Sequence, residues 1–277
     1  GMKYAVADFS AIEARVISWL ADEKWRLDVF HGDGKIYEAT GEKMFGVPKS
    51  EIKKGSVLRD KSKISELALG YEGGLGALKR MGGDKMGLSD TEMMSLVRKW
   101  RMANPNIVDM WKEIDEASKE AVRYHRAVKC TSKNVIFDCD GEFMTIELPV
   151  GRKLFYYKPE FKDKKIGRST VPIRSLCYRG IDQTTKQWIS IDTYGGKLTE
   201  NIVQAVSRDL LGDAMLRMEK AGYGIVGSIH DEVITEVPEE NAQLWYDNLV
   251  KIMSTPPLWA QDLPLNADGG VMDFYQK

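Results

Sequence analysis

Residues 224–237 read GIVGSIHDEVITEV, and this stretch decides the fold. Apolar residues on either side predict two short strands joined by a tight turn of His230, Asp231 and Glu232. Carboxylates at the tip of an apolar hairpin are costly to bury, so we expect them to be solvated or bound to a counter-charge. The hairpin therefore marks a candidate functional site.

A second carboxylate at a strand end lies near the start of the sequence. Residues 4–7 form a short apolar run that ends in Asp8, and residues 12–20 carry apolar side chains at helical spacing. Asp8 is therefore expected at the carboxyl end of a strand that leads into a helix. Two such carboxylates are the parts from which a site for divalent metals and a phosphorylated substrate is built.

Composition limits the class of protein. The 277 residues are 43% apolar and 29% charged, which is ordinary for a folded globular protein. The formal net charge of −1 argues, taken alone, against a nucleic-acid-binding domain, because such domains are usually strongly basic. The distribution of the charge along the chain matters more than its sum.

The cysteines and the apolar runs indicate a cytoplasmic protein. Cys130, Cys139 and Cys177 lack the paired short spacing and the histidine partners of a zinc site, so we expect reduced thiols and no disulfide framework. No apolar run approaches the length of a membrane span, and no signal peptide is visible. We therefore expect no membrane partner.

A basic stretch at residues 49–63 leads into an apolar helix that ends at Gly70. Within it, four residues step by four and fall in one row along a helix face: Arg59, Lys63, Leu67 and Tyr71. A basic cluster is usually a solvated face, but this row also carries an aromatic ring. A nucleoside triphosphate needs cations for its phosphates and a surface against which its base can stack. The row is a candidate nucleotide site.

The remaining sequence predicts helices on both sides of a β-rich segment. Residues 89–124 read as helices with a break at residues 104–106, and residues 130–192 alternate as short strands. The β-rich segment contains a second basic patch, which we interpret as a solvated hairpin, with phosphate contact as the alternative. The patch comprises Lys153, Lys158, Lys162, Lys164, Lys165 and Arg168.

A long helix is predicted over residues 199–221, with Thr199 as its cap and Gly222 as its stop. Its apolar stripe leaves Gln204 and Arg208 on part of the remaining surface. The helix leads directly into the hairpin. A further amphipathic helix is predicted over residues 241–253.

Three segments, in this order, resemble the polymerase motifs of family A DNA polymerases. They are residues 7–15 (ADFSAIEAR), the row from Arg59 through Lys63 to Tyr71, and the triplet at residues 230–232. Residues 194–204 (YGGKLTENIVQ) also resemble the segment before the last motif in phage and prophage members. The resemblance covers nearly the whole chain. One motif alone is weak, whereas all three in order are a specific signal.

The resemblance implies a metal site and a nucleotide site. Asp8 and Asp231 would hold two Mg²⁺ ions with the backbone carbonyl of Phe9 as a further ligand, and Glu232 would be an auxiliary acid. The other implied residues divide into two groups. The nucleotide would contact Arg59, Lys63, Leu67, Tyr71 and, at its sugar, Glu13, and DNA would contact Gln204, Arg208 and His230.

Alternatives remain for some of these residues, and the family pattern has exceptions. Glu13 also suits the first turn of a helix because of the helix dipole, His230 suits a turn, and Gln204 suits an exposed helix surface. Three positions depart from the family pattern. Ala11 stands where many members have Gln, Leu67 where an aromatic residue is usual, and Tyr37 where a histidine often lies.

The implied fold is α+β. Residues 1–22 with 196–277 would form a palm with an antiparallel sheet and packed helices. Residues 23–195 would form a mainly helical fingers lobe that includes a β-rich segment at about 129–195. We expect the thumb and exonuclease domains of the family to be absent from this sequence.

The implied function is template-directed DNA synthesis from deoxynucleoside triphosphates on a DNA primer–template. We expect weak activity from this chain by itself, a bacterial host with a phage or prophage origin, and a thumb or exonuclease portion or replication accessory proteins as further partners. One alternative is a non-catalytic DNA-binding or accessory remnant. The residues that argue against it are Asp8, Asp231, Arg59 and Lys63. A single-subunit RNA polymerase is the other, and Glu13 and Glu232 argue against it.

Overall fold

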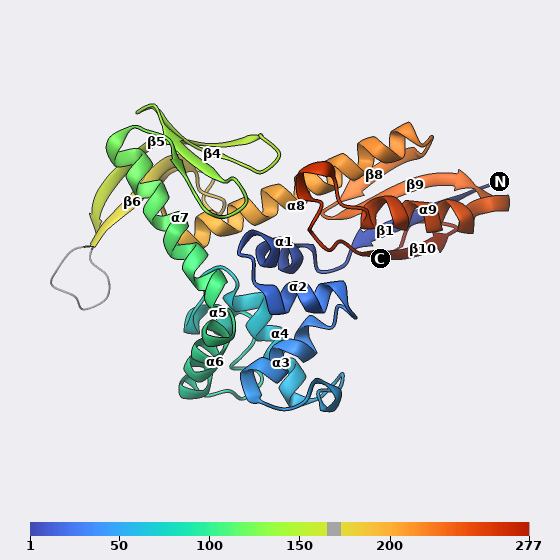
Figure 1. Ribbon diagram of the computed structural model, residues 1–277, viewed down its shortest axis with the longest axis horizontal. Helices are drawn as coiled ribbons and strands as arrows, with labels where there is room; N and C mark the ends of the chain where they lie inside the picture. Colours follow the sequence, from blue (N-terminus) through green and yellow to red (C-terminus); the bar gives the residue numbers. More distant parts are fainter. Residues whose placement is uncertain (165–172, 277) are drawn as a thin grey trace. The chain divides into compact units, whose positions relative to one another are not determined.

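A computed structural model describes residues 1–164 and 173–276 (Figure 1). The chain forms two compact units. Unit 1 consists of Gly1–Trp19, Lys24–Lys35 and Val203–Lys277, and unit 2 consists of Leu20–Glu23 and Ile36–Ile202. Unit 1 is assembled from segments at the two ends of the sequence, so its core depends on long-range contacts.

Unit 1 is built on a four-stranded antiparallel sheet in the order β10-β1-β9-β8. The strands are β1 (Met2–Phe9), β8 (Gly224–Ile229), β9 (Glu232–Pro238) and β10 (Ala267–Met272). Helix α9 (Ala242–Ser254) packs against β1, β9 and β10. The other helical elements are α1 (Ile12–Leu20), α2 (Lys24–His31), η2 (Glu239–Asn241), η3 (Leu258–Ala260) and the later part of α8 (Gly195–Lys220). The first and last thirds of the sequence therefore share one sheet.

Three helices of unit 2 begin at residues suited to that position. The helical elements between residues 36 and 124 are α3 (Ile36–Phe45), η1 (Lys49–Glu51), α4 (Val57–Leu69), α5 (Leu75–Arg80), α6 (Asp90–Ala103) and α7 (Pro105–Tyr124). Ser56 caps α4 by accepting a hydrogen bond from the Arg59 amide at 3.3 Å, and Ser89 forms a capping box with Glu92 at the start of α6. Pro105 opens α7, where its missing amide hydrogen costs nothing.

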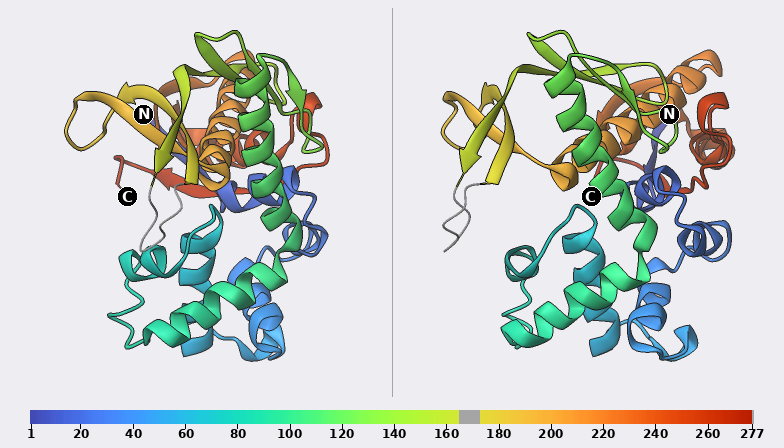
Figure 2. Two further views of the ribbon diagram at one scale, coloured as in Figure 1. Left: turned by 90° about the vertical axis from the view of Figure 1, so that its left-hand side faces the viewer. Right: turned by 60° about the vertical axis from the view of Figure 1, so that its left-hand side comes forward.

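Unit 2 also contains a six-stranded antiparallel sheet in the order β2-β3-β4-β5-β6-β7. The strands are β2 (Val128–Lys129), β3 (Ile136–Cys139), β4 (Phe143–Glu147), β5 (Lys153–Lys164), β6 (Ile173–Ile181) and β7 (Trp188–Thr193). Helix α7 packs against β2, β3 and β4. Both views of Figure 2 show β5 and β6 extending beyond the part of the sheet that α7 covers.

The predicted mixed α and β fold with antiparallel sheets is confirmed. Within the described ranges, no helix has the length and apolar character needed to span a bilayer. Cys130, Cys139 and Cys177 are free and buried, as the prediction of reduced thiols requires. Two members of the second basic patch, Lys165 and Arg168, lie outside the described residues, and so does the side chain of Lys164.

The predicted cap at Thr199 is wrong. Helix α8 begins at Gly195, and the buried Thr199 hydroxyl lies inside the helix and donates to the Gly195 carbonyl at 2.8 Å. The Gly195-Gly196 pair reads as a turn in sequence, but it serves close packing. A Cβ at Gly195 would lie 2.0 Å from the Trp111 carbonyl oxygen, and one at Gly196 would lie 2.5 Å from that of Tyr71. The predicted stop is confirmed, because Gly222 has a φ of +89°.

Candidate active site

The sheet of unit 1 places three carboxylates in one line across neighbouring strands. The antiparallel register pairs Asp8 of β1 with Glu232 of β9 on one side and with Asp268 of β10 on the other. Directly opposed residues point to the same face of a sheet. The Phe9 amide donates to the Asp231 carbonyl at 3.2 Å, which ties the turn of the hairpin to the end of β1. The predicted residues Asp8, Asp231 and Glu232 therefore gather at one end of this sheet.

The hairpin differs from its prediction in one residue. Its turn contains His230 and Asp231, whereas Glu232 is the first residue of β9 and is only 6% exposed. The Tyr275 hydroxyl donates to Glu232 Oε1 at 2.9 Å. The prediction that Glu232 is solvated or bound to a counter-charge is wrong, because the Tyr275 phenol donates to it and a neutral donor also compensates the loss of water.

Asp268 is a neighbour that the sequence did not reveal. It accepts hydrogen bonds from the Tyr246 hydroxyl at 3.3 Å and from the Gly269 amide at 2.8 Å. Residues 267–270 read ADGG, which resembles a turn, yet they lie in β10. The glycine is needed there because a Cβ at Gly269 would lie 2.0 Å from the Val6 carbonyl oxygen. The close approach of two backbones therefore places a glycine-rich segment in a strand, and alternation in the sequence does not report this.

The negative charge of this cluster contributes to the raised pKa values of two neighbouring tyrosines. The pKa of Tyr275 is raised above its usual value, first by its hydrogen bond to Glu232, then by burial and by the charges of Glu232 and Asp8. Burial and the charge of Asp268 likewise raise the pKa of Tyr246. A phenolate is disfavoured in both places because negative charge is already concentrated there. Such a field favours a bound cation.

Two turns beside the cluster hold residues with strained backbone, and a buried arginine of α1 fixes one of these turns. Ala11 and His230 have φ values of +52° and +56°, a region that residues other than glycine seldom adopt. The buried Arg15 donates to the carbonyls of Ser10 and Pro264, each at 2.7 Å, and burial lowers the pKa of its guanidinium to about 10. Arg15 therefore fixes the loop after β1, a role that its place in the first motif did not reveal.

The remaining predicted residues of unit 1 lie on helix surfaces and in the turn. Glu13 is exposed in the first turn of α1, and Gln204 and Arg208 are exposed on α8, one turn apart. His230 is exposed in the turn. These side chains are accessible to a ligand.

The structure places part of the predicted row of unit 2 on one helix. Arg59, Lys63 and Leu67 lie on α4, but Tyr71 lies beyond Leu69, where the helix ends. Arg59 Nε donates to Glu38 Oε1 at 2.5 Å, and its guanidinium carbon lies 5.4 Å from the Tyr37 ring centre. Lys63 and Leu67 are exposed, whereas Arg59 and Tyr71 are half-buried. Lys63 is thus the more accessible cation of the row.

The carboxylates of unit 1 suit magnesium by their chemistry. Asp8, Asp231 and the Phe9 carbonyl offer only oxygen atoms, which Mg²⁺ prefers, and this ion is usually held by one or two carboxylates together with substrate phosphates. Across residues 1–164 and 173–276, no group of three or more His, Cys, Asp or Glu residues forms a metal site by itself. A site completed by substrate phosphates fits both observations.

The chain is similar to a known protein over its whole length. No protein-family model matches the chain. A curated relative from Bacillus phage SP02 is 46% identical over 278 residues, which cover 100% of this chain and 42% of the relative. That relative is named "DNA polymerase". The chain therefore spans about two fifths of the length of this relative.

A solved structure is similar to the chain over 98% of its length. It is the POL domain of Pol1 from M. smegmatis in complex with a DNA primer-template and dNTP, with a TM-score of 0.65 and 16% identity. The match covers 39% of that chain. The fold resembles that of a POL domain. At this identity, the likeness concerns the fold alone.

Proposed function

We propose that this chain carries the nucleotidyl-transfer site of a DNA-directed DNA polymerase of family A, of the phage type. It would join deoxynucleoside triphosphates to the 3′-hydroxyl of a DNA primer under the direction of a template. The pairing of Asp8 with Glu232, beside Asp231, in a chain 46% identical to a phage DNA polymerase carries the proposal. Unit 1 would supply most of the palm and unit 2 most of the fingers.

The carboxylates of Asp8 and Asp231 and the Phe9 carbonyl would hold two Mg²⁺ ions. When bound, the ions activate the attacking hydroxyl and neutralise charge on the phosphates. Glu232 stays fixed by Tyr275, so its carboxylate adds negative charge at a constant position. The protein's own contribution is then to hold the reacting groups in place.

The other predicted residues would position the substrates. Lys63 would contact the triphosphate, and Arg59 would do so while held by Glu38. The nascent base pair would lie against Leu67 and Tyr71, and Glu13 would exclude a ribose 2′-hydroxyl. The remaining contacts, to the primer–template, would come from Gln204, Arg208 and His230.

Primer extension tests the proposal. A labelled primer on a DNA template, with Mg²⁺ and deoxynucleoside triphosphates, should be extended by the parent chain and not by Asp231→Asn. Asp247→Asn is the matched control, because Asp247 is an exposed carboxylate of α9 in the same unit. Extension by Asp231→Asn at the parent's rate would contradict the proposal, and so would a parent chain that extends no primer. Preference for ribonucleotides would indicate an RNA polymerase.

A further inference from the structure

The six-stranded sheet of unit 2 has one covered face and one open face. Residues of β4 and β5 alternate strictly: Met144, Ile146 and Tyr156 are buried, whereas their neighbours Phe143, Thr145 and Phe155 are not. On the covered face, which packs against α7, the Tyr156 hydroxyl accepts a hydrogen bond from Asn201 of α8 at 2.8 Å. The core therefore lies on this side of the sheet. Packing against α7 does not account for the residues on the other side.

The open face carries a continuous row of aromatic rings. Phe143 lies 6.1 Å from Phe155 and 5.2 Å from Tyr157, and Tyr157 lies 6.1 Å from Trp188 of β7, measured between ring centres. Phe155 is 65% exposed and Trp188 is 58% exposed. Single exposed apolar residues are ordinary, but a contiguous group of large rings marks a binding surface. We call these four residues the aromatic row.

Cations border the aromatic row. The register places Arg179 directly opposite Tyr157, and the Lys158 ammonium lies 5.4 Å from the centre of the Tyr157 ring. Lys158 has a φ of +46° and stands at a β-bulge, which turns its side chain out of the regular alternation. The bulge therefore keeps a cation beside the half-buried Tyr157 ring, at the border of the aromatic row.

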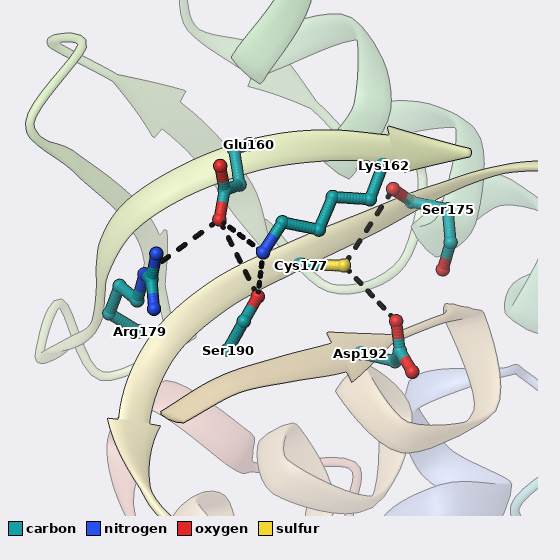
Figure 3. Close-up of polar contacts among 7 residues, drawn as sticks. All are labelled: Glu160, Lys162, Ser175, Cys177, Arg179, Ser190 and Asp192. Atoms are coloured by element: carbon teal, nitrogen blue, oxygen red, sulfur yellow. Dashed lines mark hydrogen bonds and ion pairs between the residues drawn. The ribbon is translucent and has the colours of Figure 1, made fainter. Parts of the chain in front are cut away.

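Arg179 and a further cation of the same sheet, Lys162, form ion pairs with one carboxylate. Figure 3 shows Glu160 between Lys162 and Arg179, at 2.8 Å and 3.8 Å, with the Lys162 ammonium also donating to the Ser190 hydroxyl at 2.8 Å. These partners are about 40% exposed, and ion pairs at such positions contribute little to stability. A phosphate can therefore replace the carboxylate at low cost.

The charge of this segment differs from that of the whole chain. Residues 128–193 contain 12 Lys and Arg against 8 Asp and Glu, a balance of +4, whereas the whole chain has a net charge of −1. The rest of the chain is therefore acidic, and the aromatic row lies in the basic part. Rings flanked by cations on the open face of a sheet match a strand of nucleic acid, whose bases stack and whose phosphates are anionic.

We propose that the open face of the β2–β7 sheet binds single-stranded DNA. Bases stack on Phe155, Tyr157 and Trp188, while Lys158 and Arg179 contact phosphates. A duplex does not suit this surface, since its bases already stack on one another. The binding of single-stranded DNA does not depend on the proposed polymerase function. Only the identity of the strand, the unpaired template, rests on that function.

Binding of a labelled oligothymidylate of about 16 nucleotides, followed by fluorescence anisotropy with the full chain, tests this proposal. Trp188→Ala and Phe155→Ala should each weaken binding about tenfold, because one base loses its stacking partner. Tyr124→Ala is the matched control: Tyr124 is 59% exposed in the last turn of α7 and lies near two arginines, but it is not on the sheet. Its affinity should equal that of the parent.

Salt and duplex measurements sharpen the test. Lys158→Gln and Arg179→Gln should each lower the slope of log affinity against log salt by about 0.7, the value for one lost phosphate contact on a single strand. A blunt duplex should compete poorly. Unchanged binding by the Trp188 and Phe155 variants would overturn the proposal, as would an equal loss in Tyr124→Ala. If Trp188→Ala instead dissociated a dimer of the parent without changing DNA binding, the face would be an interface between copies.

The outcome can be separated from that of the polymerase proposal. Asp231→Asn should bind the oligothymidylate like the parent while it fails to extend a primer. If the parent bound the oligothymidylate through the aromatic row but showed no primer extension, the polymerase function would be refuted and this site would stand. If Trp188→Ala and Phe155→Ala lose binding but keep the thermal unfolding midpoint of the parent, misfolding is excluded as the cause.

Discussion

The candidate residues of the two units are held in different ways. In unit 1, Asp8 and Glu232 are fixed by strand register, and the Tyr275 hydroxyl holds the buried Glu232. In unit 2, Lys63 and Leu67 project from one exposed side of α4. Positions set by backbone pairing allow little adjustment, whereas exposed side chains on a helix can adapt. We therefore expect changes in unit 1 to have all-or-none effects and changes in unit 2 to have graded effects.

The largest effect is expected at the two aspartates. Asp8→Ala and Asp231→Ala should each lower the primer-extension rate by at least about 10³-fold, because residues that act as one unit fail together. The thermal unfolding midpoint should stay near that of the parent, since a repulsive carboxylate is removed. A loss of only a few-fold in either variant would break the contrast between the units.

A graded effect is expected at Lys63. Lys63→Ala removes a charge-assisted hydrogen bond worth roughly 1.5–3 kcal/mol, so the KM for nucleotide should rise about tenfold to a hundredfold with a smaller change in kcat. Lys61→Ala is the control, because Lys61 is a lysine of the same helix that pairs with Glu92 at 3.8 Å and is not in the predicted row. An equal KM for the parent and Lys63→Ala would show that the row of Arg59, Lys63, Leu67 and Tyr71 is a solvated helix face and not a nucleotide site.

A smaller effect is expected where Tyr275 holds Glu232. Tyr275→Phe removes one hydrogen bond, worth about 1 kcal/mol, and should lower kcat roughly fivefold while KM for nucleotide is kept. Tyr223→Phe is the control, because the Tyr223 hydroxyl donates to the Trp245 carbonyl at 2.7 Å outside the carboxylate cluster. A rise in KM with unchanged kcat would assign Tyr275 to substrate binding.

The smallest effect concerns alkaline stability, and it should be confined to unit 2. Burial raises the pKa of the Cys130 thiol from 9.0 to about 12 and that of Cys177 from 9.0 to about 11. A pKa raised on folding means that the thiols contribute stability in full below pH 9, and that this contribution falls as the pH rises toward 11 and 12. Cys130→Ala should flatten the decline in the urea midpoint above pH 9, measured with reductant present. A decline as steep as that of the parent would contradict this assignment.

The sequence predicted the parts of the site whose pattern is local. The hairpin, the strand before Asp8 and the helix that carries Arg59 and Lys63 follow from alternation and helical spacing. The start of α8 was misplaced because Gly195 reads as a turn, although close packing against Trp111 requires it. Local patterns do not report such approaches between distant backbones.

Contacts between distant segments also escaped prediction. Asp268 and Tyr275 follow the hairpin by more than 30 residues, and only the pairing of β1 with β10 brings Asp268 beside Asp8. Arg15 donates to the Pro264 carbonyl, 249 residues later in the sequence. Residues of this kind are found from strand register and not from a motif.

The central claim is that Asp8 and Asp231 form one metal site, and Mn²⁺ binding tests it most directly. Mn²⁺ replaces Mg²⁺ and is followed by electron paramagnetic resonance in the presence of a deoxynucleoside triphosphate, with no primer and no turnover. The account predicts that Asp8→Asn and Asp231→Asn each weaken protein-dependent Mn²⁺ binding by at least about tenfold, while Asp247→Asn binds like the parent. Parent-like binding by both site variants would contradict it.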